Sequence, residues 1–197
     1  MEIIEPISRS PELINKEDCL ILIIDVQEQF IKGLSQEVTQ KLIHKIKHLI
    51  KVAQVLDIPI IVTAEDIQKN NTIHEELLEV LEKKVKIFDK FIYSCWGQRN
   101  IQEEIKKYQK KFIVLCGLET DVCVMQTAID LIANGYGVVL LSDLTFSRNT
   151  TEHEIGLKRI ESQGAIISLL KTWQEEITAG IRTKINKVIK MHHLDDV

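Results

Sequence analysis

The chain has 197 residues, of which 45% are hydrophobic and 27% are charged, and its formal net charge is −4. This composition is ordinary for a soluble globular protein, and the length suits one core of useful size, so we expect a single domain over residues 1–197. The acidic balance and the interspersed basic residues argue against nucleic acid and anionic membranes as partners. A content of 8 Gly and 3 Pro is not that of an extended disordered chain.

In chain order we predict a strand at 19–24, a helix at 36–56, a strand at 59–63, a short helix at about 72–82, a strand at 85–88, a helix at 97–108 and a strand at 112–116. A helix at 120–134, a strand at 138–141, a helix at 151–163, a strand at 165–169 and helical segments at 172–178 and 181–190 complete the chain. Short apolar runs indicate the strands, and amphipathic stretches indicate the helices.

Six strands that alternate with helices indicate a three-layer α/β fold, in which helices cover both faces of a parallel sheet. The strands read as continuously apolar, which is typical of strands buried on both faces. We expect the Rossmann-like strand order 3-2-1-4-5-6, followed by a C-terminal helical extension at about 172–190. An apolar stripe in this extension could cap the core or meet a second subunit; its residues are Ile177, Ile181, Ile185 and Val188.

The N-terminus carries no pattern of an export signal, because residues 1–18 include five acidic side chains and no long apolar core. The longest apolar run, at residues 19–24, is too short to span a bilayer. The cysteines form no CxxC pair of the kind that binds metals, so we expect free thiols in a reducing cytoplasm. They are Cys19, Cys95, Cys116 and Cys123.

Three chemically active side chains follow predicted strands. Asp25 comes after the first strand, Lys90 follows the third, and Cys123 opens the helix after the fourth. Ligands of open parallel sheets bind outside the carboxyl ends of the strands, so an acid, a base and a thiol fall at the binding edge. Spacing alone does not show that these side chains meet.

Cys123 is predicted to lie in the first turn of its helix, with Thr120 or Asp121 as the N-cap. A helix N-terminus stabilises a thiolate, and its unpaired N–H groups can hold an oxyanion. The alternative is a buried, inert cysteine. Asp25 could likewise be an acid that caps a turn, and Lys90 could be an ordinary solvated lysine.

Other reactive residue types have simpler interpretations. His44 and His48 lie four residues apart among several lysines, which is more typical of a solvated basic helix face than of a metal site. Cys95 and Cys116 are interpreted as packed thiols. No GxGxxG follows the first predicted strand, so the dinucleotide-binding fingerprint is absent.

Four segments of the chain resemble the isochorismatase-like cysteine hydrolases. They read IIDVQEQF at 23–30, DKFIYSCWG at 89–97, CGLETDVCV at 116–124 and TEHEIGLKRIESQGA at 151–165. Their order and spacing match over roughly residues 18–170, and GLETDVCV is the most specific of them. The pattern is most similar to the metal-free branch that includes YcaC-type bacterial hydrolases and mitochondrial isochorismatase-domain proteins.

The resemblance implies a catalytic triad, in which Asp25 is the general base, Lys90 steers charge and Cys123 is the nucleophile. In such an enzyme the base takes the proton of the thiol, the sulfur forms a covalent acyl intermediate with the substrate, and water hydrolyses that intermediate. The alternatives are a non-catalytic Rossmann-like binding module and an oligomeric pseudoenzyme.

The resemblance also implies functions for the loop that precedes the nucleophile. It implies a cis peptide between Leu118 and Glu119, and an oxyanion hole formed by the N–H groups of Val122 and Cys123. Aromatic residues in the loops beside these motifs are the candidates for contacting the substrate; they are Phe30, Phe91, Tyr93 and Trp96.

Two departures from related enzymes restrict the substrate. Nicotinamidases of this superfamily carry an Asp-x-His…His metal site after the second strand, whereas Asp66 and His74 here do not have that spacing. We therefore expect no metal and no cofactor, and nicotinamide is not the expected substrate. Isochorismatases of siderophore pathways lack the cysteine, which argues against vinyl-ether cleavage. The expected activity is hydrolysis of an amide-like C–N bond, an ester or a thioester in a small molecule, by a homo-oligomer.

Overall fold

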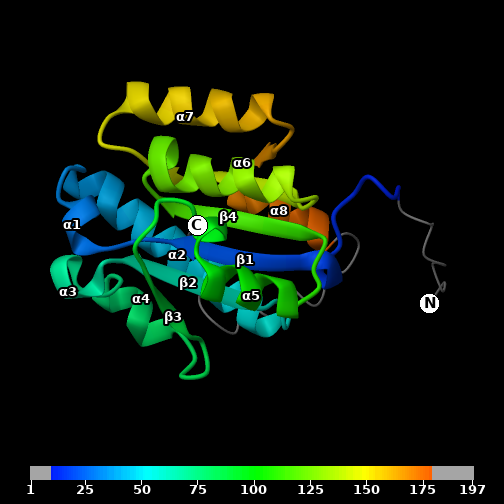
Figure 1. Cartoon of the computed structure of the whole chain (residues 1–197), viewed down its shortest axis with the longest axis horizontal. Helices are drawn as coiled ribbons and strands as arrows, with labels where there is room; N and C mark the ends of the chain where they lie inside the picture. Colours follow the sequence, from blue (N-terminus) through cyan, green and yellow to red (C-terminus); the bar gives the residue numbers. More distant parts are fainter. Residues whose placement is uncertain (1–9, 179–197) are drawn as a thin grey trace, which may run out of the picture.

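A computed structural model describes residues 10–178 of the chain. It has a six-stranded sheet in the order β3-β2-β1-β4-β5-β6, and all neighbouring strands pair in parallel (Figure 1). The predicted fold class and strand order are confirmed. The strands are β1 (Cys19–Ile24), β2 (Ile60–Glu65), β3 (Ile87–Lys90), β4 (Phe112–Leu118), β5 (Gly137–Phe146) and β6 (Ile166–Ser168).

Helices cover both faces of the sheet (Figure 1). One face packs against α1 (Glu28–Ile31), α2 (Gln36–Val55), α3 (Ile67–Asn70), α4 (Glu75–Val80) and α8 (Leu170–Ile177). The other packs against α5 (Arg99–Lys107), α6 (Met125–Ala133) and α7 (Thr150–Ser162). Short helical turns are η1 (Lys16–Asp18), η2 (Cys95–Gly97) and η3 (Thr120–Val124), the last of which is π-helical.

The central strand β1 shows why its sequence is apolar throughout. All six of its side chains are buried, and alternate residues enter the two core clusters on opposite faces of the sheet. The edge strand β3 does not follow this pattern, because Ile87 and Asp89 are only half-buried. The expectation of continuously apolar strands therefore holds at the centre of the sheet and fails at this edge.

Four strands, β2, β3, β4 and β5, end later in the chain than the sequence predicted. β2 continues past residue 63 to Glu65, and β5 continues past residue 141 to Phe146. The extra residues of β2 pair with β3, where Ala64 lies opposite Asp89 and Glu65 lies opposite Lys90. Polar residues are accommodated here because this is the end of the strand that faces the polar cluster described below.

The C-terminal helix α8 caps the sheet. Leu170, Trp173 and Ile177 are buried in the core, so the apolar side of this helix is used within the protomer. The remainder of the predicted extension, with Ile181, Ile185 and Val188, lies outside the described residues. Within residues 10–178 no helix combines the length and the apolar character needed to cross a membrane.

The prediction of a solvated basic face on α2 was wrong for His48. This side chain is only 5% exposed, and its Nε2 lies 2.8 Å from Oε1 of Gln174 in α8. Burial lowers the pKa of His48, so the ring is neutral in the folded protein. The partner is 126 positions away in the sequence, which is why local periodicity could not identify the contact.

We expect the free energy of unfolding to decrease as the pH falls below about 6.5, the ordinary pKa of histidine. The lowered pKa of His48 means that the unfolded chain binds the proton more readily, so acid favours unfolding. The effect is absent above that pH and grows as the pH falls toward the lowered pKa. Urea unfolding between about pH 5 and 7 measures it.

His48→Gln should reduce the pH dependence without removing it. Burial also lowers the pKa of His153, and this second histidine keeps part of the slope. A His48→Gln protein with the same pH dependence as the wild type would contradict the prediction.

Candidate active site

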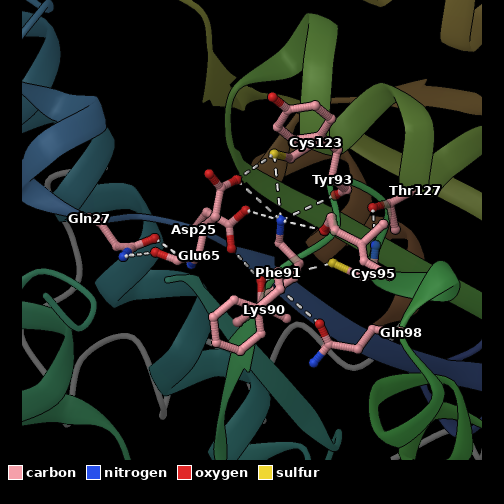
Figure 2. Close-up of polar contacts among 12 residues, drawn as sticks. Asp25, Gln27, Glu65, Lys90, Phe91, Tyr93, Cys95, Gln98, Cys123 and Thr127 are labelled. Carbon is pink, nitrogen blue, oxygen red and sulfur yellow. Dashed lines mark hydrogen bonds and ion pairs between the residues drawn. The ribbon is translucent and has the colours of Figure 1, made fainter. Parts of the chain in front are cut away.

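The predicted acid, base and thiol lie together at the carboxyl edge of the sheet (Figure 2). Asp25 directly follows β1, Lys90 ends β3, and Cys123 belongs to the turn η3 after β4. The Nζ of Lys90 is 2.9 Å from Oδ2 of Asp25 and 3.6 Å from Sγ of Cys123. The structure therefore brings the three residues into one cluster, with the ammonium between the other two.

Asp25 is fully buried and is held by the neighbouring strand. Its Oδ1 accepts a hydrogen bond of 2.8 Å from the Thr63 hydroxyl, while its Oδ2 faces Lys90. Its backbone has φ +50°, a left-handed conformation that aspartate adopts more readily than most residues. Burial raises the pKa of Asp25, and Lys90 opposes this shift only in part. The carboxylate is thus a stronger base than an exposed aspartate.

Lys90 is a fully buried ammonium with several acceptors. Besides Asp25, it donates to the backbone carbonyls of Ile92 at 2.9 Å and Tyr93 at 3.2 Å. Burial alone would lower the pKa of Lys90, but the charge of Asp25 and its contact with the ammonium oppose burial, and the pKa lies above its ordinary value. Lys90 is therefore a fixed positive charge and not a proton carrier.

Cys123 is 4% exposed, and its thiol is protonated at rest. Burial raises the pKa of Cys123, the Asp25 and Glu65 carboxylates raise it further, and Lys90 opposes them. A helix terminus favours a thiolate, but its effect does not keep the pKa of this buried thiol low. Burial is the largest cause of the raised pKa, and the two carboxylates add to it against one ammonium, so any attack by this sulfur needs a base.

The loop before Cys123 differs from the predicted capping. The Leu118–Glu119 peptide is cis. Glu119 occupies the N-cap position in place of Thr120 or Asp121, and no side chain caps the turn. The Glu119 carbonyl accepts hydrogen bonds from the N–H groups of Val122 at 3.2 Å and Val124 at 3.1 Å. The Val122 N–H expected in an oxyanion hole therefore already has an internal acceptor.

The segment 151–165 contacts the turn η3, which carries Cys123. In α7, Nδ1 of His153 lies 2.8 Å from the Thr120 hydroxyl. Gly156 lies against the turn, where a Cβ would come within 2.9 Å of the Asp121 backbone. Ser147, after β5, donates to Oδ1 of Asp121 at 2.6 Å. These contacts fix the turn that carries Cys123.

Gly117 allows β4 to approach β1 beside Asp25. It has φ +121°, and a Cβ here would lie 2.0 Å from the carbonyl oxygen of Ile24. No other residue fits at this position without displacing the backbone. The glycine thus sets the spacing between the strand that leads to Asp25 and the strand that leads to Cys123.

Glu65 is a member of the cluster that the sequence analysis missed. It ends β2, and its Oε2 lies 3.5 Å from both Nζ of Lys90 and Sγ of Cys123. Gln27 holds its backbone, since Oε1 accepts from the Glu65 N–H at 2.7 Å and Nε2 donates to the Glu65 carbonyl at 2.9 Å. The sequence does contain a signal for Glu65, since this acid ends a strand much as Asp25 directly follows one. The predicted strand stopped at residue 63, so Glu65 was not recognised as lying at its carboxyl end.

The cluster has the donor types of a metal site. The reactive atoms of Asp25, Glu65 and Cys123 lie within 4.8 Å of one another. The Lys90 ammonium contacts all three, at 2.9, 3.5 and 3.6 Å. A protein cation thus already stands where a metal ion would have to bind these donors.

Asp66 and His74, the acid and histidine of the region after β2, serve as helix caps. Asp66 accepts the N–H of Lys69 at 3.2 Å, and Nδ1 of His74 accepts the N–H of Glu76 at 3.3 Å. The other ring nitrogen of His74 lies 3.1 Å from Oε1 of Glu28. Both side chains therefore have local structural partners.

The candidate aromatic contacts separate into two groups. Phe91 and Tyr93 are 70% and 55% exposed in the loop after β3, beside Lys90. Phe30 is half-buried against the core. The expectation for Trp96 was wrong: it is buried, with its ring 5.3 Å from that of Tyr136, just before β5 at the opposite edge of the sheet. Trp96 is a core residue.

The other thiol in the same region is closed to reagents. Cys95 is fully buried, its N–H donates to the Thr127 hydroxyl at 2.9 Å, and its sulfur is 3.9 Å from the Thr63 hydroxyl. Burial raises the pKa of Cys95 to about 12. It is a packed thiol, and it provides a matched comparison for Cys123.

Proteins of similar sequence align with most of this chain. The secreted isochorismatase effector Isc1 of Phytophthora sojae is 31% identical over 185 residues, which cover 88% of this chain and 85% of that protein. Isochorismatase family protein 1A of Dictyostelium discoideum is 33% identical over 176 residues, covering 86% and 83% of the two chains.

Solved structures have the same fold. The MAR1 ribonuclease from Caenorhabditis elegans superposes with a TM-score of 0.82 at 28% identity, over 91% of both chains. The YcaC gene product of Escherichia coli, described as an octameric hydrolase of unknown specificity, superposes with a TM-score of 0.85 at 19% identity, over 95% of this chain and 94% of that one. The isochorismatase domain model matches residues 19–172, and with these relatives it shows that the chain belongs to the isochorismatase family of hydrolases.

Proposed function

We propose that the protein is a cysteine hydrolase that cleaves an amide-like C–N bond, or an ester or thioester, in a small molecule. The observation that carries the proposal is the buried contact of Lys90 with both Asp25 and Cys123. Family membership supports hydrolysis. The neutral thiol and the raised pKa of Asp25 support a pair in which the carboxylate activates the sulfur.

The reaction begins when Asp25 takes the thiol proton and the Cys123 sulfur adds to the substrate carbonyl carbon. The N–H of Cys123 stabilises the oxyanion, since that of Val122 already donates to the Glu119 carbonyl. Lys90 stays charged and balances the negative charge as it moves from Asp25 to the substrate oxygen. The C–N bond then breaks, and Asp25 returns the proton to the leaving amine. Water, deprotonated by Asp25, hydrolyses the thioester and restores the thiol.

The substrate enters beside Phe91 and Tyr93, the exposed aromatic residues of the loop after β3. Phe30 is the third aromatic candidate. No metal or cofactor takes part, because the Lys90 ammonium supplies the positive charge among the donors of the cluster.

A panel of small amides, carbamoyl compounds, esters and thioesters tests the proposal, with and without a chelator. The protein should hydrolyse at least one class in both conditions, and mass spectrometry of a slow substrate should place the acyl group on Cys123. No hydrolysis of any compound by a folded protein would favour the binding module or the pseudoenzyme. An acyl group on Cys95 would contradict the assignment of the nucleophile.

RNA is a less suitable substrate, although the similar protein from C. elegans is described as a ribonuclease. The site places two carboxylates against one ammonium, and the chain has a formal net charge of −4. Both features repel phosphodiesters. RNA cleavage that disappears in Cys123→Ala would show that the small-molecule assignment is wrong.

We further propose that the protein is a homo-oligomer, as the similar E. coli protein is an octamer. Light scattering at micromolar concentration should report a multiple of the chain mass of 22.7 kDa. A species of 22.7 kDa would contradict the proposal.

A cytoplasmic location is proposed from the thiols. All four cysteines are buried and free, as expected in a reducing compartment. The Phytophthora relative is described as secreted, so fractionation of the source cells is the deciding measurement.

A further inference from the structure

The Glu65 carboxylate lies in the cluster without a part in the triad. Its Oε2 contacts both Lys90 and Cys123 at 3.5 Å, and Figure 2 shows it beside Asp25 on one side of the ammonium. The mechanism above uses a single carboxylate. The second carboxylate has an electrostatic cost, because a carboxylate next to a nucleophilic thiol disfavours the thiolate.

The charges in the cluster do not balance. Asp25 and Glu65 carry two negative charges, Lys90 carries one positive charge, and the thiol is neutral. Lys90 is closer to Asp25, at 2.9 Å, than to Glu65, at 3.5 Å. Glu65 therefore keeps the larger share of the uncompensated negative charge.

The solvent exposure of the charged side chains determines which of them an incoming molecule can contact. The side chains of Asp25 and Lys90 are buried, whereas that of Glu65 is 23% exposed. Cys123 is accessible only to a small degree, and Glu65 lies next to its sulfur. A molecule that reaches the sulfur must place its reacting carbon close to this carboxylate.

Glu65 cannot easily move aside. Gln27 holds the backbone of Glu65 on both sides with bonds of 2.7 and 2.9 Å. The same side-chain amide also donates to the Asn71 carbonyl at 2.7 Å, which fixes Gln27 itself. The backbone that carries the carboxylate is therefore preorganised, and the carboxylate itself contacts Lys90 and Cys123.

We propose that Glu65 is a specificity-determining residue, which selects substrates with an N–H donor beside the scissile carbonyl and rejects substrates with a carboxylate there. An ionised carboxylate only accepts hydrogen bonds, and a bond from an amide N–H to it is charge-assisted. An ester offers no such donor, and a carboxylate is repelled. The substrate class is therefore primary amides and carbamoyl compounds. This inference rests on the proposed cysteine hydrolase function.

Alkylation of Cys123 by iodoacetamide and iodoacetate tests the selection without a known substrate. The reagents differ in carrying an amide or a carboxylate beside the reacting carbon. In both, the sulfur displaces iodide and gives up its proton to the base. Mass spectrometry measures the rate at Cys123, and the ratio of the two rates is divided by the ratio for free cysteine.

The wild type should favour iodoacetamide by at least about tenfold over the preference of free cysteine. Glu65→Gln should bring the normalised ratio close to one. The matched control is Glu37→Gln, which removes the same charge from an exposed glutamate of α2 and should keep the wild-type ratio. A Glu65→Gln ratio equal to that of the wild type would overturn the proposal.

Two further outcomes separate the alternatives. If Glu65→Gln changes both rates by the same factor, Glu65 acts on the thiol and not on the reagent, and the proposal fails. Added salt provides a test without any variant, since it should raise the iodoacetate rate of the wild type and leave the iodoacetamide rate unchanged. Equal responses to salt would also overturn it. Selective alkylation in a protein that hydrolyses no compound of the panel would support the selection and refute the hydrolase function.

Discussion

Cys123→Ala should abolish turnover, and Asp25→Asn should lower kcat/KM by ~10²–10⁴-fold. The first change removes the sulfur that would carry the acyl group. The second keeps the size of the side chain and an oxygen that can accept from Thr63. An amide cannot accept the thiol proton or return it to a leaving amine, and the thiol has a raised pKa, so little thiolate forms without the base.

The measurement is steady-state kinetics on the best compound of the panel, with circular dichroism as a check that each variant folds. Cys95→Ala is the matched control, because it removes a buried thiol of the same region whose sulfur lies 3.9 Å from the Thr63 hydroxyl and which is not assigned to the triad. It should keep activity within a few-fold. Normal turnover by Cys123→Ala would show that the sulfur is a core thiol and that the hydrolase mechanism is wrong.

The sequence was sufficient to place Asp25, Lys90 and Cys123 at the carboxyl edge of the sheet, because the rules for that placement are local. A continuous apolar run predicts β1, the residue after a buried strand faces the binding edge, and Asp25 therefore belongs to that edge. The same rule applies to Glu65, but Thr63 and Glu65 are polar, and a polar residue reads as the end of a strand. The strand continues because its backbone pairs with β3, and a single sequence does not show that pairing.

The protonation state of Cys123 and the burial of His48 could not be predicted for a related reason. Each depends on partners that the fold supplies from distant positions. Cys123 is buried beside Asp25 and Glu65, and burial together with these charges raises its pKa against the effect of Lys90. His48 meets Gln174 of the last described helix. Helical periodicity gives the face on which a residue lies, but it does not say whether another helix covers that face.

Lys90→Met should lower the free energy of unfolding by about 3–5 kcal/mol, because it leaves the fully buried Asp25 without its counter-charge. Glu65 makes the loss larger, since the two carboxylates remain close together. The loss should decrease as the pH falls. Without Lys90 the folded-state pKa of Asp25 rises further, so the folded protein gains stability when that carboxylate is protonated. Urea unfolding at about pH 5 and pH 8 measures the difference.

A double variant shows whether the unpaired charge is the cause. Asp25→Asn with Lys90→Met removes both partners of the ion pair, and it should recover most of the stability lost in Lys90→Met alone. It should remain inactive, since it lacks the base. Lys84→Met, which removes an exposed lysine paired with Glu82, is the control and should change stability by no more than about 0.5 kcal/mol. If the losses in the two single variants simply add in the double variant, Lys90 stabilises the fold by packing, and its charge is not what holds Asp25 in the core.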